Sequence, residues 1–281
     1  MTAPEHTTPP HADATEAFDA AERAMWRGRT EAYAGSFARL CAHPVPALLD
    51  AAGVGEGTRV LDAGTGTGTA AVAARARGAR VSAVDADAGM VAAARARGID
   101  ARIAELVELP YPDGEFDAVV GNFVLNHVGR PRTALAELHR VLRPGGRIAV
   151  TTWSTRRGAG QDLLGRACEA GGAVPPPYLP RLDPAQDWPR TPEGLARLLG
   201  GAGFVAAEAD ELAWEHRAGV EEWWSGAAGG VATIGLVVTA QDPGTVARIR
   251  REYDRLSAEH TVAEGRLALP HIALLGSGRR P

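Results

Sequence analysis

One stretch of nine residues constrains the fold of this 281-residue chain more than any other. The apolar pair Val60-Leu61 leads into a turn with a glycine at every second position: Gly64, Gly66 and Gly68. Glycine has no Cβ, so the turn can bend tightly and a ligand can lie against its backbone. The Ala- and Val-rich run 69–76 predicts a helix, whose first N–H groups lack partners within the helix. Strand, glycine turn and helix in this order indicate a nucleotide site in a parallel α/β sheet.

A carboxylate ends the next predicted strand. Asp85 follows the apolar run 81–84 and stands seventeen residues after Gly68. At that position a carboxylate is placed to bind the hydroxyl groups of a ribose. Asp85 could instead cap the helix predicted after it, and so could Asp87. Both interpretations stay open at this point.

The glycine turn resembles motif I of the class I S-adenosylmethionine-dependent methyltransferases, D/E-x-G-x-G-x-G, with Asp62 as its acid. Three later segments resemble further parts of the same family. Residues 105–117 are similar to G-D-A-x-x-L-P-F-P-D-x-S-F-D, residues 122–128 to the segment after the fourth strand, and residues 138–146 to the turn L-x-R-V-L-K-P-G-G. The G-x-G-x-G spacing and that last turn disfavour a NAD-linked dehydrogenase, although Asp85 alone would suit one.

The resemblance implies S-adenosylmethionine as cofactor and S-adenosylhomocysteine as its product. In this family the acid after the second strand holds the ribose, and Glu105 takes the place of the acid that accepts a hydrogen bond from the adenine amino group, with Glu for the usual Asp. An apolar residue at Met90 often lies against the adenine, although packing in the core is an alternative. The residues expected to bind the cofactor are Tyr33, Asp62, Gly64, Thr65, Gly66, Gly68, Asp85, Ala86, Met90, Glu105, Leu106 and Asn122.

The order of predicted elements implies a Rossmann-like α/β fold. We expect a seven-stranded, mostly parallel sheet with helices on both faces and a helical cap. The predicted divisions are a disordered tail over 1–12, an N-terminal helical lid over 13–55, a cofactor-binding core over 56–153, and the rest of the sheet over 154–281 with cap insertions at about 154–190 and 217–260.

The methyl acceptor is expected where the fourth strand ends, beside the cofactor. His127 follows that strand, and an imidazole titrates near neutral pH, so it is the candidate general base, with a packing role as the alternative. The insertions are rich in aromatic side chains, which suit the wall of an apolar pocket. We expect the pocket to include Tyr178, Trp188 and Trp223.

Composition narrows the partners of the chain. Its net charge of −4 at pH 7 argues against sequence-independent binding to nucleic acid. The two cysteines show no metal-binding spacing, and the first residues lack the apolar core of a signal peptide. We therefore expect a cytoplasmic monomer or homodimer that binds no metal, membrane or nucleic acid.

The leading hypothesis is methyl transfer to a small, largely apolar molecule, with O-methylation of a natural product favoured. N- or C-methylation on the same fold is an alternative, as is a non-methylating cyclase that keeps S-adenosylmethionine as a structural ligand. A nucleic-acid methyltransferase is disfavoured because residues 122–125 lack an Asn/Asp-Pro-Pro-Tyr/Phe motif.

Overall fold

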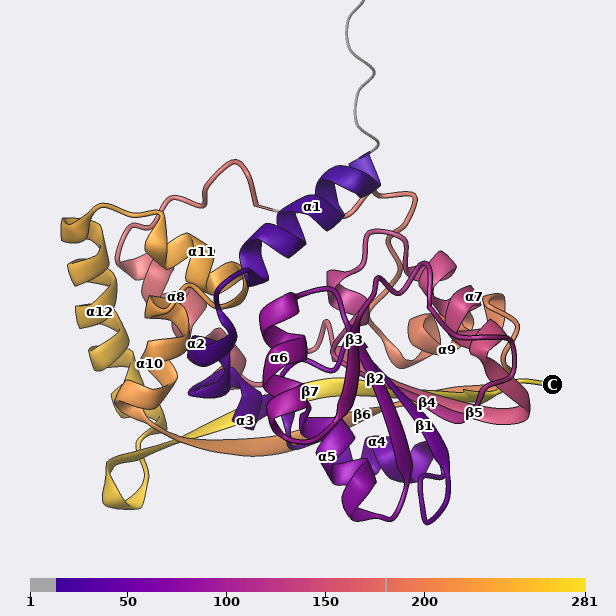
Figure 1. Ribbon diagram of the computed structural model, residues 1–281. Coiled ribbons are helices and arrows are strands. Elements are labelled where there is room, and N and C mark those ends of the chain that lie inside the picture. Colours follow the sequence, from indigo (N-terminus) through magenta and orange to yellow (C-terminus); the bar gives the residue numbers. More distant parts are fainter. Residues whose placement is uncertain (1–13, 180) are drawn as a thin grey trace, which may run out of the picture.

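A computed structural model describes residues 14–179 and 181–281, so the predicted tail over 1–12 lies outside the described residues. Within them, one sheet has the strand order β3-β2-β1-β4-β5-β7-β6 (Figure 1). β7 is antiparallel to both of its neighbours, and the other pairs are parallel. The prediction of a seven-stranded, mostly parallel sheet is confirmed. The strands are β1 Arg59–Ala63, β2 Arg80–Asp85, β3 Asp100–Ile103, β4 Phe116–Asn122, β5 Leu142–Trp153, β6 Val205–Gly219 and β7 Arg266–Arg279.

Helices cover both faces of the sheet because its central strands are apolar on both sides. In β1, Val60 packs with α4 and α5, while Leu61 packs with α7 and α9 on the opposite face. The helices of the described chain are α1 Ala14–Trp26, α2 Thr30–Ala34, α3 Phe37–Cys41, α4 Val45–Ala51, α5 Thr69–Ala76, α6 Ala88–Ala96, α7 Pro131–Val141, α8 Leu163–Ala170, α9 Pro192–Gly201, α10 Val220–Ala228, α11 Ala232–Thr239 and α12 Pro243–Ser257, with short 3₁₀ turns at Leu125–His127, Ala159–Asp162, Ala258–His260 and Ala263–Gly265.

A second core forms beyond the edge of β5. β6 and β7 form a long antiparallel ribbon and pair along its whole length, but β5 pairs only with residues 273–279 of β7. The part of the ribbon beyond β5 packs against α8, α10, α11 and α12, whose buried residues include Trp224 and Tyr253. Figure 1 shows these helices gathered at one end of the long ribbon. They come from the two connections in which cap insertions were predicted. The second connection begins at Val220 rather than 217, because β6 continues to Gly219.

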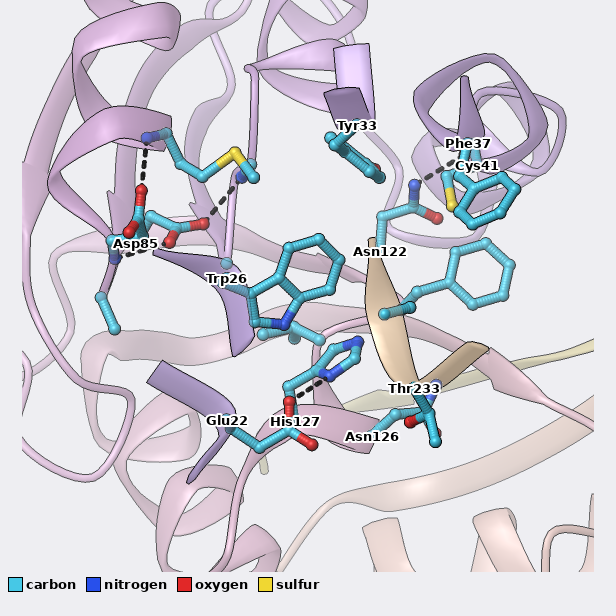
Figure 2. Close-up of a pocket in the computed structure, with 18 of the residues that line it drawn as sticks. Glu22, Trp26, Tyr33, Phe37, Cys41, Asp85, Asn122, Asn126, His127 and Thr233 are labelled. Atoms are coloured by element: carbon cyan, nitrogen blue, oxygen red, sulfur yellow. Dashed lines mark hydrogen bonds and ion pairs between the residues drawn. The ribbon is translucent and has the colours of Figure 1, made fainter. Parts of the chain in front are cut away.

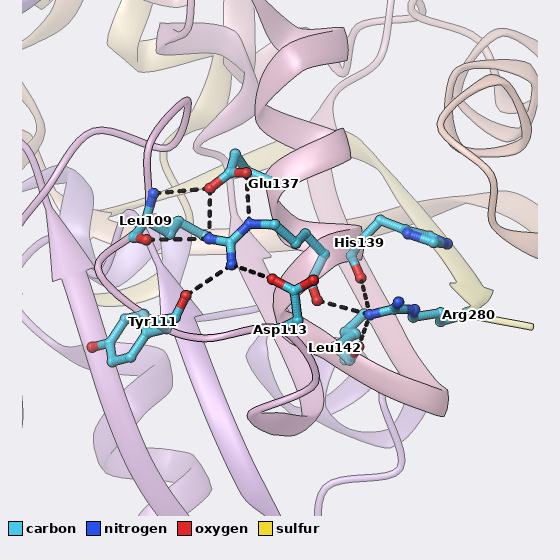
Figure 3. A network of polar contacts seen from close by, with 8 residues as sticks. Leu109, Tyr111, Asp113, Glu137, His139, Leu142 and Arg280 are labelled. Carbon is cyan, nitrogen blue, oxygen red and sulfur yellow. Dashed lines mark hydrogen bonds and ion pairs between the residues drawn. The ribbon is translucent and has the colours of Figure 1, made fainter.

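The loop between β3 and β4 is fastened to α7 by a single guanidinium. Arg140 uses all five of its N–H donors: two go to the Glu137 carboxylate, one to Asp113, and two to the carbonyls of Leu109 and Tyr111 (Figure 3). Glu137 also accepts the Leu109 N–H at 3.0 Å. The loop that carries Glu105 is therefore held at several backbone positions.

No helix among the described residues is long and apolar enough to span a bilayer. The predicted lid over 13–55 divides into two parts. α1, α2 and α3 lie over the ends of the strands, whereas α4 packs against α5 beneath the sheet. α4 is thus part of the core.

Candidate functional site

A cavity of about 890 Å³ opens at the carboxyl ends of β1, β2 and β4. Its wall is built from the glycine turn, the start of α6, the β3–β4 loop and the segment after β4. α1, α2 and α3 cover it, and α8, α10, α11 and β7 close its far end. The lining is mainly apolar with a few polar groups, as in small-molecule pockets.

The glycine turn meets the cavity at Gly64 and Gly66, both with positive φ, +70° and +53°. A Cβ on Gly64 would lie 2.1 Å from a methyl group of Val124, so glycine is needed there for packing. A Cβ on Gly66 would clash with nothing, because its nearest neighbour would be the Tyr33 ring, in ordinary van der Waals contact at 3.7 Å. Gly66 therefore leaves room for a ligand against the backbone.

Asp62 lies beneath the turn and is buried. Its Oδ2 accepts hydrogen bonds from Thr65 Oγ1 at 2.7 Å and from the Ala71 N–H at 3.0 Å. Burial raises the pKa of Asp62 to about 6. Asp62, Thr65 and Gly68 support the turn and do not line the cavity, unlike the other predicted cofactor-binding residues.

Asp85 lines the cavity at the end of β2. Its two oxygens accept the N–H groups of Gly66 and Asp87 at 2.8 and 2.9 Å. Burial raises the pKa of Asp85, and these two hydrogen bonds oppose the rise. Asp87 caps α6 by accepting the Met90 N–H. The capping alternative for Asp85 is therefore wrong, and its carboxylate faces the cavity instead.

Four more predicted cofactor residues gather next to Asp85: Ala86, Met90, Glu105 and Leu106. The side chains of Met90 and Leu106 are apolar and buried. Glu105 forms an ion pair with Arg23 of α1 at 2.8 Å, between two half-exposed side chains. This end of the cavity thus combines apolar surface with the carboxylates of Asp85 and Glu105.

Asn122 ends β4 at the opposite side of the glycine turn. Its amide donates to the Cys41 carbonyl at 2.8 Å and accepts from Thr151 Oγ1 at 2.7 Å, which ties the sheet to α3. Tyr33 lies nearby (Figure 2), and burial raises its pKa well above the ordinary value. The next residue, Phe123, has a positive φ of +58° and stacks on Trp153 with ring centroids 4.2 Å apart. Strained backbone of this kind concentrates at functional sites.

His127 points into the cavity and is paired with a carboxylate. Its Nδ1 lies 2.8 Å from Glu22 Oε2 of α1, and its ring meets the Trp26 ring edge to face at 5.2 Å (Figure 2). Because a carboxylate only accepts hydrogen bonds, Nδ1 carries the proton and Nε2 is left to accept one. Glu22 is 7% exposed, so water screens the pair little.

The three aromatic residues predicted for the acceptor pocket separate in the structure. Trp223 of α10 lines the cavity. Tyr178 is 62% exposed in the loop after α8, and Trp188 is buried in the core beside α9. The prediction is wrong for Tyr178 and Trp188, because neither lines the cavity: the Tyr178 side chain faces solvent, and Trp188 packs in the core.

Five further residues that were not predicted for the site also line the cavity: Glu22, Trp26, Phe37, Trp153 and His271. For Glu22 the helical pattern of the sequence contained a sign that its side chain is buried. Phe18 and Met25 form the buried stripe of α1, and Glu22 lies on that same stripe at helical spacing. A carboxylate on a buried face requires a partner, and His127 is that partner.

The cavity fits the cofactor that the resemblance implies. Gly66 lines the cavity without a side chain, so a ligand can lie against the backbone of the turn. Asp85 and Glu105 supply carboxylates next to apolar surface. Across residues 14–179 and 181–281 there is no cluster of His, Cys, Asp and Glu side chains suited to holding a metal ion.

Comparisons with known proteins agree with this geometry. Residues 61–150 match the family described as Methyltransferase domain. The demethylmenaquinone methyltransferase of Mycolicibacterium paratuberculosis is 32% identical over 164 residues, which span 55% of this chain and 71% of that protein.

Two solved structures share the fold. The YcgJ protein from Bacillus subtilis has a TM-score of 0.53 at 18% identity and covers 85% of this chain and 98% of its own. Haemonchus contortus phosphoethanolamine N-methyltransferase 2, in complex with phosphomonomethylethanolamine and S-adenosylhomocysteine, has a TM-score of 0.54 at 16% identity, covering 98% of this chain and 61% of its own.

Proposed function

Because the chain belongs to the class I S-adenosylmethionine-dependent methyltransferases of the small-molecule type, we propose that it methylates a hydroxyl group of a small, largely apolar natural product. The observation that carries the proposal is the pair of His127 and Glu22 in the wall of an apolar cavity. A hydroxyl group must lose its proton when its oxygen is methylated, and this pair is suited to take that proton.

The cofactor supplies an electrophilic methyl group on a sulfonium. We assign its ribose to Asp85 and its adenine to the surface made by Met90, Leu106 and Glu105. Its methionine end then lies near Gly66, Tyr33 and Asn122, with Asp62 holding the turn from below. These assignments rest on the cavity wall and on the family resemblance.

His127 acts as the general base in this proposal. Nε2 takes the hydroxyl proton, and the resulting imidazolium is stabilised by the Glu22 carboxylate at Nδ1. The Trp26 ring packs edge to face against the imidazole and holds it from the side. The rest of the chain contributes by aligning the acceptor hydroxyl with the methyl group, since α1, α2 and α3 cover the cavity in which they meet.

The test measures product mass and S-adenosylhomocysteine release with a panel of hydroxylated ring compounds, for the natural protein and for His127→Gln. We expect a mass gain of one methyl group on oxygen, and a fall in kcat of about 10²- to 10⁴-fold in the variant. Binding of S-adenosylhomocysteine should be unchanged. Unaltered kcat in His127→Gln, or methylation at nitrogen or carbon only, would contradict the proposal.

Demethylmenaquinone is a second candidate methyl acceptor, because the curated relatives are named for it. It belongs in the same panel. A higher kcat/KM for demethylmenaquinone than for every hydroxylated compound would select this candidate over O-methylation of another product.

A further inference from the structure

The far end of the cavity has a floor of aromatic rings that the proposed base does not touch. Trp153 pairs with Ala273, and Trp214 pairs with His271, so Trp153, Trp214 and His271 share one face of the β5–β7–β6 sheet. Their rings are 5.9 to 6.1 Å apart, and Trp223 of α10 stands at 79° to the His271 ring at 5.6 Å. His127 belongs to a different group of rings, with Trp26 and Tyr33.

His271 is the polar residue of this floor that lines the cavity. Its Nδ1 lies 2.8 Å from the Leu269 carbonyl, which can only accept, so Nδ1 carries the proton. In the neutral imidazole Nε2 therefore has a free lone pair. The only hydrogen bond of His271 among the residues that the structure describes is the one at Nδ1, and His271 lines the cavity, so Nε2 is open to a ligand there.

The imidazole stays neutral at ordinary pH. Burial lowers the pKa of His271 to about 4, and the neighbouring His216 has its pKa lowered in the same way. The nearest guanidinium in the cavity wall, Arg157, is already paired with Asp162. A neutral lone pair in an apolar wall favours a neutral donor such as O–H over a cation, whose charge would lose its hydration there.

We propose that His271 selects the methyl acceptor: its Nε2 accepts a hydrogen bond from a hydroxyl group, other than the one that is methylated, on a ring that packs against Trp153 and Trp223. This assignment rests on the proposed function, because it takes the aromatic end of the cavity as the acceptor site. His271 is a specificity-determining residue here, and proton removal remains with His127.

The test compares 1-naphthol with naphthalene, which has the same ring system without the hydroxyl group. Binding of each probe to the protein loaded with S-adenosylhomocysteine is followed by tryptophan fluorescence. The natural protein is expected to prefer 1-naphthol by about tenfold, and His271→Phe to lose that preference. His216→Phe is the matched control: it is equally buried on the same floor, contacts Trp223 and does not line the cavity. It should keep the preference.

A measurement on the natural protein covers the case in which His271→Phe does not fold. In spectra of the ¹⁵N-histidine-labelled protein, the chemical shift of the unprotonated nitrogen of one neutral imidazole, Nε2 of His271, should change on addition of 1-naphthol and not of naphthalene. The proposal is overturned if the natural protein shows no preference, if His271→Phe retains it, or if His127→Phe or His216→Phe abolishes it. None of these readouts needs methyl transfer, so a failure of the His127 test leaves them interpretable.

Discussion

Glu22 and His127 lie 105 residues apart in the chain and meet at 2.8 Å. The carboxylate fixes which imidazole nitrogen carries a proton, and it comes from a helix that no motif covers. Asp85 shows the same dependence on neighbours: its oxygens hold the Gly66 N–H, so the residue shapes the glycine turn while it faces the cavity. Among single residues, the proposed function thus depends on carboxylates that position a neighbouring group: Glu22 holds the His127 imidazole, and Asp85 holds the Gly66 N–H.

We predict that Glu22→Gln lowers kcat about 10- to 1,000-fold with little change in KM, because the amide keeps a hydrogen bond to Nδ1 but cannot stabilise an imidazolium. Steady-state kinetics with the methyl acceptor test this. Glu16→Gln, an exposed change on the same helix, should behave like the natural protein. A rise in KM with kcat unchanged would assign Glu22 to the lid alone.

We predict that Asp85→Ala weakens S-adenosylmethionine binding by about 1–3 kcal/mol, the loss expected for a hydrogen bond to a charged group. Calorimetric titration measures it. Asp87→Ser removes a neighbouring charge while retaining a helix cap, and it should bind the cofactor normally. Equal weakening in both variants would show that local charge, rather than the Asp85 position, is responsible.

At the scale of elements, α1 makes three polar contacts to segments that line or flank the cavity. Asp19 accepts the Gly129 N–H at 2.6 Å, Glu22 pairs with His127, and Arg23 pairs with Glu105. Opening of the helix therefore breaks bonds to the site itself.

We predict that Asp19→Ala combined with Arg23→Ala speeds release of S-adenosylhomocysteine about three- to tenfold, because two contacts worth roughly 1 kcal/mol together are lost. Stopped-flow release and hydrogen exchange over 14–26 report this. Glu16→Ala is the control. Faster exchange in α1 without faster release would mean that α1 does not act as a lid.

At the scale of the whole molecule, burial of titratable groups makes stability depend on pH. The pKa values of His216 and His271 are lowered to about 4, so between pH 4 and 6.5 the unfolded chain binds more protons than the folded one. Stability therefore falls as pH falls through this window. Asp62, with its pKa raised to about 6, acts in the opposite sense, since the folded chain binds the extra proton between about pH 4 and 6.

We predict a net loss of stability on acidification. The two buried histidines act together with carboxylates whose pKa is lowered, such as Asp117 and Glu137, against Asp62 and Asp85, whose pKa values are raised. His216→Phe should reduce the difference in unfolding free energy between pH 7 and pH 4.5 by roughly 1–3 kcal/mol. Urea unfolding at the two pH values measures it, with His260→Phe, a less buried histidine, as control. An unchanged difference in His216→Phe would show that His216 is not held neutral.

The sequence alone determined the sheet and one end of the cavity. Strand and helix patterns and the glycine turn are local properties, and the carboxyl ends of parallel strands necessarily meet at one edge. Gly66, Asp85 and Leu106 could therefore be expected at the same ligand, as could Asn122 and His127, and the structure brings all five to one cavity.

Only the tertiary structure decided how that cavity is closed. Glu22, Trp153 and His271 come from segments whose packing partners no local pattern specifies. Trp188, which was predicted to line the pocket together with Trp223, packs in the core instead. The physical reason is that periodicity shows which side of an element is apolar, but not which of several apolar surfaces will cover it. In this chain the cavity is closed by the helices that pack on the long antiparallel ribbon of β6 and β7, at the end that extends beyond β5.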